Sequence, residues 1–317
     1  MLNFLLLILA LLLVIKSADY SIRYSARLAL GLRLSKYVIG FTIVAAISAL
    51  PETLIAISSA LQNIPSFGLG TLLGSNVADL TVVFAMVVLI SGHSLKIESQ
   101  FLKNRFYYVA ILAAPILFGL NGYYSRLEGA ALIAIGLFFY IFVLKRCRRE
   151  KDSGLPKVKF LIKLKNLLLL ILSLAVLLLG AYLTVKFAVL SARTLGISPV
   201  FIALIVGLGT CLPELSFSIK AAKHNHENLA LGDILGTVVT DATIVVGILS
   251  LVKPFAFNQG IIFITGLFML FAIILLLYFM KTGKVLTKGE SLLLLLFYLL
   301  FVLTEFAFGG YFGQLAG

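Results

Sequence analysis

The sequence predicts an all-α, polytopic membrane protein with ten transmembrane helices in two inverted five-helix repeats. Hydrophobic residues make up 61% of the 317 residues and charged residues only 12%, whereas a soluble domain carries about 25% charged residues. The mean hydropathy is +1.12, and the apolar runs reach the roughly 20 residues that a helix needs to cross a bilayer. A polar pattern in the first half of the chain also recurs in the second half. These observations exclude a soluble fold.

The apolar runs define the predicted helices in order along the chain. They cover residues 2–20, 37–62, 69–90, 105–121, 126–144, 166–192, 199–221, 229–252, 259–280 and 290–308. Strands of a membrane barrel would instead alternate apolar and polar residues over about ten positions, and that pattern is missing from the sequence. The first run, Leu2–Ile15, has no basic segment before it and no small-residue cleavage site after it. We therefore expect a retained helix rather than a cleaved signal peptide.

The basic residues indicate how the chain is oriented in the bilayer. The net charge is +13, and 22 of the 26 Lys and Arg residues fall at one end of the predicted helices, many of them in the loop at residues 145–165. Cytoplasmic loops carry such an excess, so we expect a multi-pass protein of the cell membrane with this loop in the cytoplasm and both termini outside. Because topology accounts for the charge, no nucleic-acid partner and no obligatory protein partner are predicted.

An internal repeat divides the chain. Residues 37–86 align with residues 199–248 without a gap, and the alignment gives 17 identities. Each half contains five predicted crossings, an odd number, so the second copy enters the membrane from the opposite side, as in many secondary transporters. We predict two halves, residues 1–150 and residues 151–317.

Four carboxylates lie near the centres of predicted helices, at equivalent positions of the two copies. They are Glu52 and Asp79 in the first copy and Glu214 and Asp241 in the second. The prolines and Gly-x-x-x-Gly pairs beside them are explained by kinks and close helix packing alone, but the acids are not. A charged group at the bilayer centre costs about 2.5–3.5 kcal/mol on insertion scales. We therefore predict a cation site rather than structural polar pairing.

Each of these acids follows a hydroxyl residue by one helical turn, which places both groups on one helix face. The pairs are Ser48 and Glu52, Ser75 and Asp79, Thr210 and Glu214, and Thr237 and Asp241. Pro51 and Pro213 each remove a backbone donor, which predicts free carbonyls near residues 45–47 and 207–209. Such an all-oxygen set, without a His or Cys cluster, favours Ca²⁺ or Na⁺ over Zn²⁺.

In these segments the sequence resembles the prokaryotic-type sodium/calcium exchanger family of the calcium/cation antiporter superfamily. Each repeat of that family carries a G-S/T-S-x-P-E segment followed by G-S-N-x-x-N/D. Here the segments read ISALPE at 47–52 with GSNVAD at 74–79, and GTCLPE at 209–214 with GTVVTD at 236–241. The resemblance covers both repeats, and the ten-helix count agrees with it over the whole length.

The resemblance implies a set of cation ligands. The glutamates would be the principal Ca²⁺ ligands with the hydroxyls one turn before them, and the aspartates a second pair. The remaining hydroxyls would belong to the flanking Na⁺ sites, and two backbone carbonyls would be further ligands. By position these residues are Glu52, Glu214, Asp79, Asp241, Ser48, Thr210, Ser75, Thr237, Ala45 and Gly207. The resemblance also implies that the helices near 2–20 and 166–192 slide over a fixed core.

Several positions depart from the family pattern, among them Asp79, where many members have Asn, and Val238, where Asn is usual. The serine that precedes x-P-E is Ala49 in the first repeat and Cys211 in the second; alanine offers no side-chain ligand, and a thiol is a poor ligand for Na⁺. We predict a secondary active antiporter that exchanges Ca²⁺ for Na⁺ by alternating access at midplane carboxylates. The alternative is an H⁺-coupled exchanger of Ca²⁺ or of another divalent cation, such as Mg²⁺ or Mn²⁺. The ions are cargo, so no cofactor is predicted.

Rival functions fit less well. An intramembrane aspartyl protease would carry Gly-x-Gly-Asp and Tyr-Asp, but the first glycine is Ala230 and Tyr-Asp is missing, so an enzyme is not predicted. A channel would pass current without a counter-ion. We expect Asp233 to be an interfacial cap or an ion guide at the cytoplasmic mouth, and Glu305 to be interfacial. No disulfide between Cys147 and Cys211 is expected.

Overall fold

The computed structural model describes residues 2–29, 41, 44–92, 94–96, 105–146, 160–195, 199–281 and 283–314. The first half contains the helices α1 (Leu2–Ala29), α3 (Ala45–Ser48), α4 (Leu50–Leu61), α5 (Pro65–Ala78), η2 (Asp79–Val83), α6 (Phe84–Ser91), α8 (Arg105–Phe118), η3 (Gly119–Asn121) and α9 (Arg126–Arg146). The second half contains α10 (Phe160–Leu195), α11 (Pro199–Thr210), α12 (Leu212–Lys223), α13 (Glu227–Val239), η4 (Thr240–Val245), α14 (Val246–Val252), η5 (Ile262–Gly266), α15 (Leu267–Lys281) and α16 (Lys288–Gln314).

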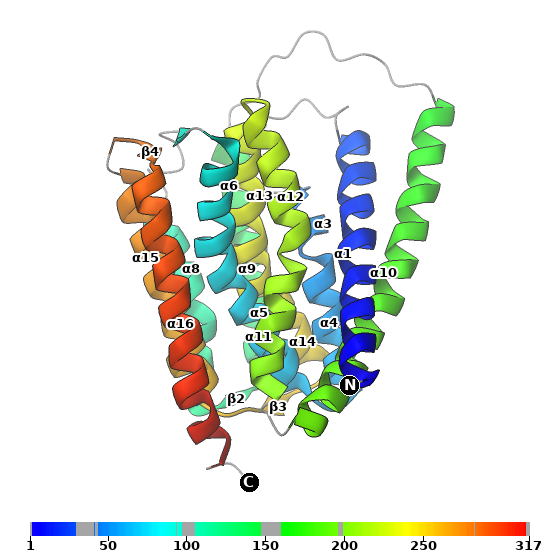
Figure 1. The fold of residues 1–317 in the computed structure, drawn as a ribbon, viewed down its shortest axis with the longest axis vertical. Helices are drawn as coiled ribbons and strands as arrows, with labels where there is room; N and C mark the ends of the chain where they lie inside the picture. The colour runs from blue at the N-terminus through cyan, green and yellow to red at the C-terminus, as the bar shows by residue number, and fades with distance from the viewer. Residues whose placement is uncertain are drawn as a thin grey trace.

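These helices confirm the predicted membrane fold. Eight described helical segments are long and apolar enough to cross a bilayer, and two shorter apolar segments, Ala45–Leu61 and Arg105–Asn121, match two further predicted spans. The first turn of α1 and the last turn of α16 lie at the same end of the bundle (Figure 1), as an even number of crossings requires. The start of the helix predicted at 37–62 lies largely outside the described residues. Which end faces the cytoplasm stays a prediction.

The helices α1 and α10 are longer than their apolar runs, and they lie side by side at one edge of the bundle (Figure 1). α10 has 36 residues, or roughly 54 Å at 1.5 Å per residue, which exceeds the thickness of the hydrocarbon core of a bilayer. A Cβ on Gly180 would meet Val14 Cγ2 at 3.0 Å, and the Ser21 hydroxyl donates to Ser173 Oγ at 2.9 Å. Close backbone approach and a buried hydrogen bond therefore hold the pair together.

The centre of the molecule is formed by two equivalent helices that each contain a π-helical segment, α5–η2–α6 and α13–η4–α14. Of their most apolar stretches, 78% and 83% of the residues are buried, against 28% for α1. Both helices carry the predicted acids and small residues, so they pack on all sides rather than face lipid. The sequence did not predict the π-helical segments.

Four strands of two residues each join the halves at both ends of the bundle. β1 (Leu95–Lys96) pairs antiparallel with β4 (Val285–Leu286), and β2 (Tyr123–Tyr124) pairs antiparallel with β3 (Phe255–Ala256). β4 lies at one end of the bundle and β2 and β3 at the other (Figure 1). Extending the ungapped alignment of the two copies places β2 over β4, so the pairs follow the predicted repeat, although the boundary between the halves stays a prediction.

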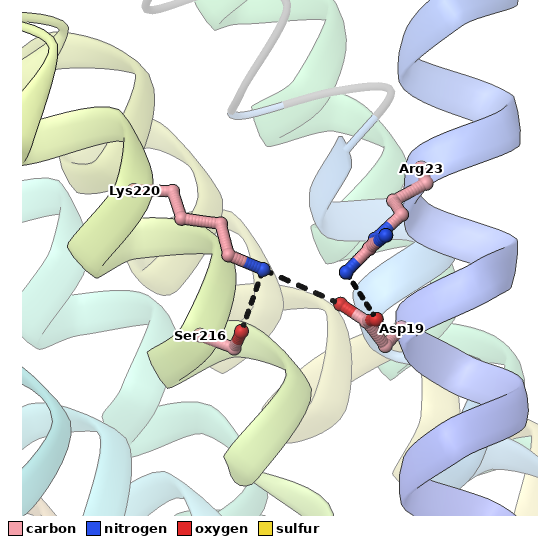
Figure 2. A network of polar contacts seen from close by, with 4 residues as sticks. All are labelled: Asp19, Arg23, Ser216 and Lys220. Carbon is pink, nitrogen blue, oxygen red and sulfur yellow. Dashed lines mark hydrogen bonds and ion pairs between the residues drawn. The ribbon is translucent and has the colours of Figure 1, made fainter.

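A polar network joins α1 to α12 near one end of the bundle. Asp19 forms an ion pair with Arg23 at 2.9 Å and a second with Lys220 at 4.0 Å, and the Lys220 ammonium also donates to Ser216 Oγ at 3.1 Å (Figure 2). These side chains are partly exposed, so the ion pairs contribute little to stability. They do fix which face of α1 meets the rest of the bundle.

Candidate cation-binding site

Both copies of the Pro-Glu motif interrupt a membrane helix in the same way. One residue stands between the two helical pieces, Ala49 between α3 and α4 and Cys211 between α11 and α12. The proline that follows has no backbone N–H to continue the helix ladder. Glu52 and Glu214 therefore lie in the first turn of α4 and α12, where the helix dipole favours negative charge.

The two glutamates are buried without full hydrogen bonding. Glu52 is 1% exposed and Glu214 is 0% exposed. One carboxyl oxygen of Glu52 and both of Glu214 have no hydrogen-bond partner among the described residues. A buried carboxylate in this state is costly unless a cation or a proton compensates it.

The two aspartates lie at the start of the π-helical segments. Asp79 is the first residue of η2 and Asp241 the second residue of η4. Single π-helical turns within α-helices occur frequently at functional sites, because they change the direction of nearby side chains. Both aspartates are buried, and one oxygen of Asp79 and both of Asp241 have no hydrogen-bond partner in the described parts of the chain.

The four predicted hydroxyls are also buried, but they use their hydrogens differently. Thr210 and Ser75 donate to carbonyls of their own helices, at 2.9 Å and 3.0 Å. Ser48 donates to Asp233 Oδ1 at 2.8 Å. The Thr237 hydroxyl has no partner within the described chain. In each case oxygen lone pairs remain for a cation.

The two predicted backbone ligands are not free carbonyls. The Ala45 carbonyl accepts the Ala49 N–H at 2.9 Å. The Gly207 carbonyl accepts the Thr210 hydroxyl at 2.9 Å and the Cys211 N–H at 3.3 Å. Each proline removes a different bond, because its missing N–H would pair with a carbonyl further along the helix than these two. At Ala45 and Gly207 only lone pairs not used in these hydrogen bonds remain for a cation, and their role as ligands stays a prediction.

The structure brings the four predicted carboxylates together from four helical segments. Asp79, Glu214 and Asp241 each lie within electrostatic range of Glu52, and Asp79 also interacts with Glu214 and Asp241. The Thr210 side chain lies beside Glu52 across the halves. No three Asp, Glu, His or Cys side chains of the described residues form a ready-made metal centre. Hydroxyl and carbonyl oxygens would therefore have to complete the coordination of a cation.

Glycines allow these helices to approach closely. A Cβ on Gly207 would meet the Thr71 carbonyl at 2.8 Å and the Ser75 N–H nitrogen at 3.1 Å. A Cβ on Gly236 would meet the Phe41 carbonyl and the Ala45 Cβ, each at 2.5 Å. Backbone contact of this kind is typical of membrane helices with small residues. It packs α11 against α5 and α13 against α3, so that helices of the two halves meet.

Two acids occupy positions that the sequence did not predict. Asp233 is 0% exposed and holds Ser48, so the prediction of an interfacial cap is wrong. Glu305 is 4% exposed, and its Oε2 accepts the Thr265 hydroxyl at 3.5 Å, so it is buried against η5, while its depth in the bilayer stays a prediction. Asp233 has no acidic counterpart in the other copy, where Thr71 aligns with it, which is why the repeat did not reveal it.

The two residues that replace the family serine before x-P-E are both buried. Ala49 is 1% exposed, and so is Cys211. The Cys211 thiol lies against the Gly207 carbonyl at 3.1 Å and the Ser75 carbonyl at 3.6 Å, and it lies beside Asp79. Cys211 is a free thiol, and Cys147 lies outside the described residues.

Comparison with known proteins identifies relatives over nearly the whole chain. The family described as "Sodium/calcium exchanger protein" matches residues 2–145 and 165–307. "Sodium/calcium exchanger MaX1" of Methanosarcina acetivorans is 26% identical over 350 residues, which cover 96% of this chain and 98% of the relative. "Putative antiporter CaxA" of Alkalimonas amylolytica is 28% identical over 253 residues, covering 77% and 79% of the two chains.

A solved structure has the same fold. The sodium-calcium exchanger NCX_Mj, soaked with 100 mM Na⁺ and 10 mM Sr²⁺, matches with a TM-score of 0.70 at 25% identity, covering 94% of this chain and 97% of that one. NCX_Mj soaked with zero Na⁺ and Ca²⁺ matches with a TM-score of 0.67. Together with the family match, these relatives show that the chain belongs to the sodium/calcium exchanger family and is a multi-pass, cation-exchanging antiporter.

Proposed function

We propose that this protein exchanges Ca²⁺ for Na⁺ across the cell membrane by alternating access at the buried carboxylates. The observation that carries the proposal is that Glu52, Asp79, Glu214 and Asp241, from four helical segments, are buried within electrostatic range of one another or of Glu52. Each has a carboxyl oxygen without a hydrogen-bond partner among the described residues. The relatives named as sodium/calcium exchangers support the choice of ions.

Charge balance explains why such a site would exchange ions rather than leak them. Four ionised carboxylates in a low-dielectric centre repel one another strongly. One Ca²⁺ offsets two of the charges, and protons or monovalent cations offset the remainder. An empty, fully charged site would face an uncompensated desolvation cost during reorientation. Loading with Ca²⁺ or with the counter-ion removes that cost, so the exchange becomes obligatory.

The pair α1 and α10 is the proposed moving part. These helices pack against each other along most of their length and meet the centre mainly through α4, α11 and α12. Their outer faces are rich in exposed leucine and isoleucine, which suits contact with lipid. In the proposal they slide over the centre and open it to alternate sides.

The second candidate is exchange of Ca²⁺ for protons. It is favoured by Ala49 and Cys211, where the family serines would offer hydroxyl ligands to Na⁺. The Cys211 thiol is directed at two backbone carbonyls. Carboxylates also bind protons directly, so the centre would still function without complete Na⁺ sites.

One experiment separates the candidates. The full chain is reconstituted in lipid vesicles, and uptake of ⁴⁵Ca²⁺ is measured with an outward Na⁺ gradient and, separately, with an outward proton gradient. We expect uptake with the Na⁺ gradient. Uptake with protons alone would establish the second candidate, and uptake that needs no counter-ion would reject both, because a channel behaves in that way.

A further inference from the structure

Asp233 adds a fifth buried carboxyl to the interior of the bundle, outside the predicted ligand set. It lies on α13 eight residues before Asp241, about 12 Å along the helix axis. The side chain is 0% exposed. A charged group at this depth requires a compensating partner.

The immediate neighbours of the Asp233 carboxyl are hydroxyls from two other helices. The Ser48 hydroxyl, on α3, donates to Oδ1 at 2.8 Å, and the Ser218 side chain, on α12, lies beside the same carboxyl. Asp233 Oδ2 and Ser218 Oγ are both buried and have no hydrogen-bond partner among the described residues. Three helices therefore enclose a small all-oxygen group with unused coordination capacity.

We propose that Asp233, Ser48 and Ser218 form a Na⁺ subsite beside the central carboxylates. Asp233 lies within electrostatic range of Asp79 and Glu214. One carboxylate and two neutral hydroxyls carry a single negative charge, which a monovalent cation neutralises. A divalent cation would exceed the charge of these three ligands and would need the carboxylates of the centre to balance it. The proposal rests on the proposed function, since it names a residue that binds the counter-ion, and it adds a subsite that the repeat pattern does not contain.

A purely structural role does not account for the carboxylate. Orienting Ser48 needs one acceptor oxygen, and an asparagine would supply it without a buried charge. The second oxygen, Oδ2, remains unpartnered in the described structure. The subsite also replaces oxygen ligands lost elsewhere, because Ala49 and Cys211 stand where the family pattern has serine.

Equilibrium binding of ²²Na⁺ to the purified full chain tests the subsite directly. Asp233→Asn keeps an acceptor for Ser48 and removes the charge. We expect it to weaken Na⁺ binding by about ten-fold or more, the scale of losing one charged ligand. Glu305→Gln is the matched control, because it removes a buried carboxyl that lies against Thr265, and its Na⁺ binding should equal that of the wild type.

Binding of ⁴⁵Ca²⁺ to the same preparations shows whether the subsite is separate from the centre. We expect Asp233→Asn to reduce Na⁺ affinity far more than Ca²⁺ affinity. Equal losses for both ions would place Asp233 in the common centre and overturn the proposal. Unchanged Na⁺ affinity in Asp233→Asn, or no Na⁺ binding by the wild type, would overturn it as well.

Two further measurements keep the test decisive. If Asp233→Asn does not fold, Ser218→Ala replaces it, and an unchanged Na⁺ affinity in that variant counts against the subsite. Vesicle transport by the wild type is measured in parallel. Absence of any Ca²⁺ exchange there rejects the proposed function, whereas the ²²Na⁺ comparison between variants still decides the subsite by itself.

Discussion

The two ends of the polar centre have related helices but different polarity. The Ser48 end comprises Ser48, Asp233 and Ser218, which meet across three helices and include a buried carboxylate. In the alignment of the two copies the equivalent residues are Thr210, Thr71 and Ala56. These three residues form the Thr210 end. There Thr210 and Thr71 donate to carbonyls of their own helices, at 2.9 Å and 3.0 Å, and Thr210 also lies beside Glu52.

This difference shows how a duplicated fold acquires a direction. The duplicated glutamates and aspartates give the centre its approximate symmetry, whereas the charge of Asp233 occurs at one end only. Similar backbones at the two ends therefore carry different polar side chains, and under the proposed function an ion would meet different ligands from each side. We expect substitutions of residues that the two ends share to have the largest effects on ion exchange. Substitutions of residues that differ between the ends should have smaller effects.

The shared glutamates should be equally indispensable. We expect Glu52→Gln and Glu214→Gln each to reduce exchange of external ⁴⁵Ca²⁺ for internal Ca²⁺ by roughly 100-fold or more, because each removes a ligand charge that a hard divalent cation requires. Glu305→Gln serves as the control and should keep wild-type exchange. Near-normal exchange in both glutamate variants would refute the assigned centre.

The close approach of helices should be more sensitive at Gly207 than at Gly74. Gly207→Ala pushes a methyl group against the Thr71 carbonyl, and overpacking of this kind costs about 1–3 kcal/mol. Gly74→Ala meets the movable end of the Leu204 side chain, Cδ2, at 2.5 Å, so its cost should be smaller. Thermal unfolding of the two variants in detergent measures the difference. A larger loss at Gly74 would contradict the backbone contact.

Ser218→Ala makes the Ser48 end resemble the Thr210 end, where Ala56 occupies the equivalent position. We expect Na⁺ affinity to fall by roughly three-fold to ten-fold, the scale of one hydroxyl interaction. The ²²Na⁺ titration measures it. Ser58→Ala, also on a buried serine but outside the subsite, is the control and should leave the titration unchanged.

The smallest effect is expected at the link between α1 and α12. Lys220→Gln removes the ion pair with Asp19, which has partners 4.0 Å apart and partly exposed. Pairs of this kind contribute about 0–1 kcal/mol, so the unfolding temperature should change little, and any change should shrink at high salt. At the other end the corresponding link, from Gln62 to the Tyr182 carbonyl, is uncharged. Its removal by Gln62→Ala should show no salt dependence.

Hydropathy and the repeat together predicted most of the architecture. The helix expected at 126–144 is α9, Arg126–Arg146, and the four duplicated acids are buried, the other three within electrostatic range of Glu52, whereas their role as ligands stays a prediction. Duplication selects residues that occur twice, however, so Asp233 was misplaced: its counterpart is Thr71. The depth of an acid along a helix does not by itself show which face it occupies, and for that reason the burial of Glu305 was not predicted.

Other features leave little trace in sequence. A π-helical turn differs from an α-helix by a shift in hydrogen bonding, and no residue pattern marked η2 or η4. The strands β1 to β4 have two residues each, too short for an alternating pattern to be recognised. One local signal was present, because Asn63 and Asn225 are identical in both copies and both adopt a left-handed conformation with φ of 63° and 57°, which asparagine tolerates well.

The four short strands have a mechanical consequence. Each strand pair joins a loop of one half to a loop of the other. The helices that flank these loops are therefore connected by backbone hydrogen bonds at both ends of the bundle (Figure 1). Neither α1 nor α10 contributes a residue to these strand pairs. Hydrogen bonds at both ends of the bundle resist hinging between the halves. In the proposed mechanism, α1 and α10 can therefore move relative to the centre without breaking either strand pair.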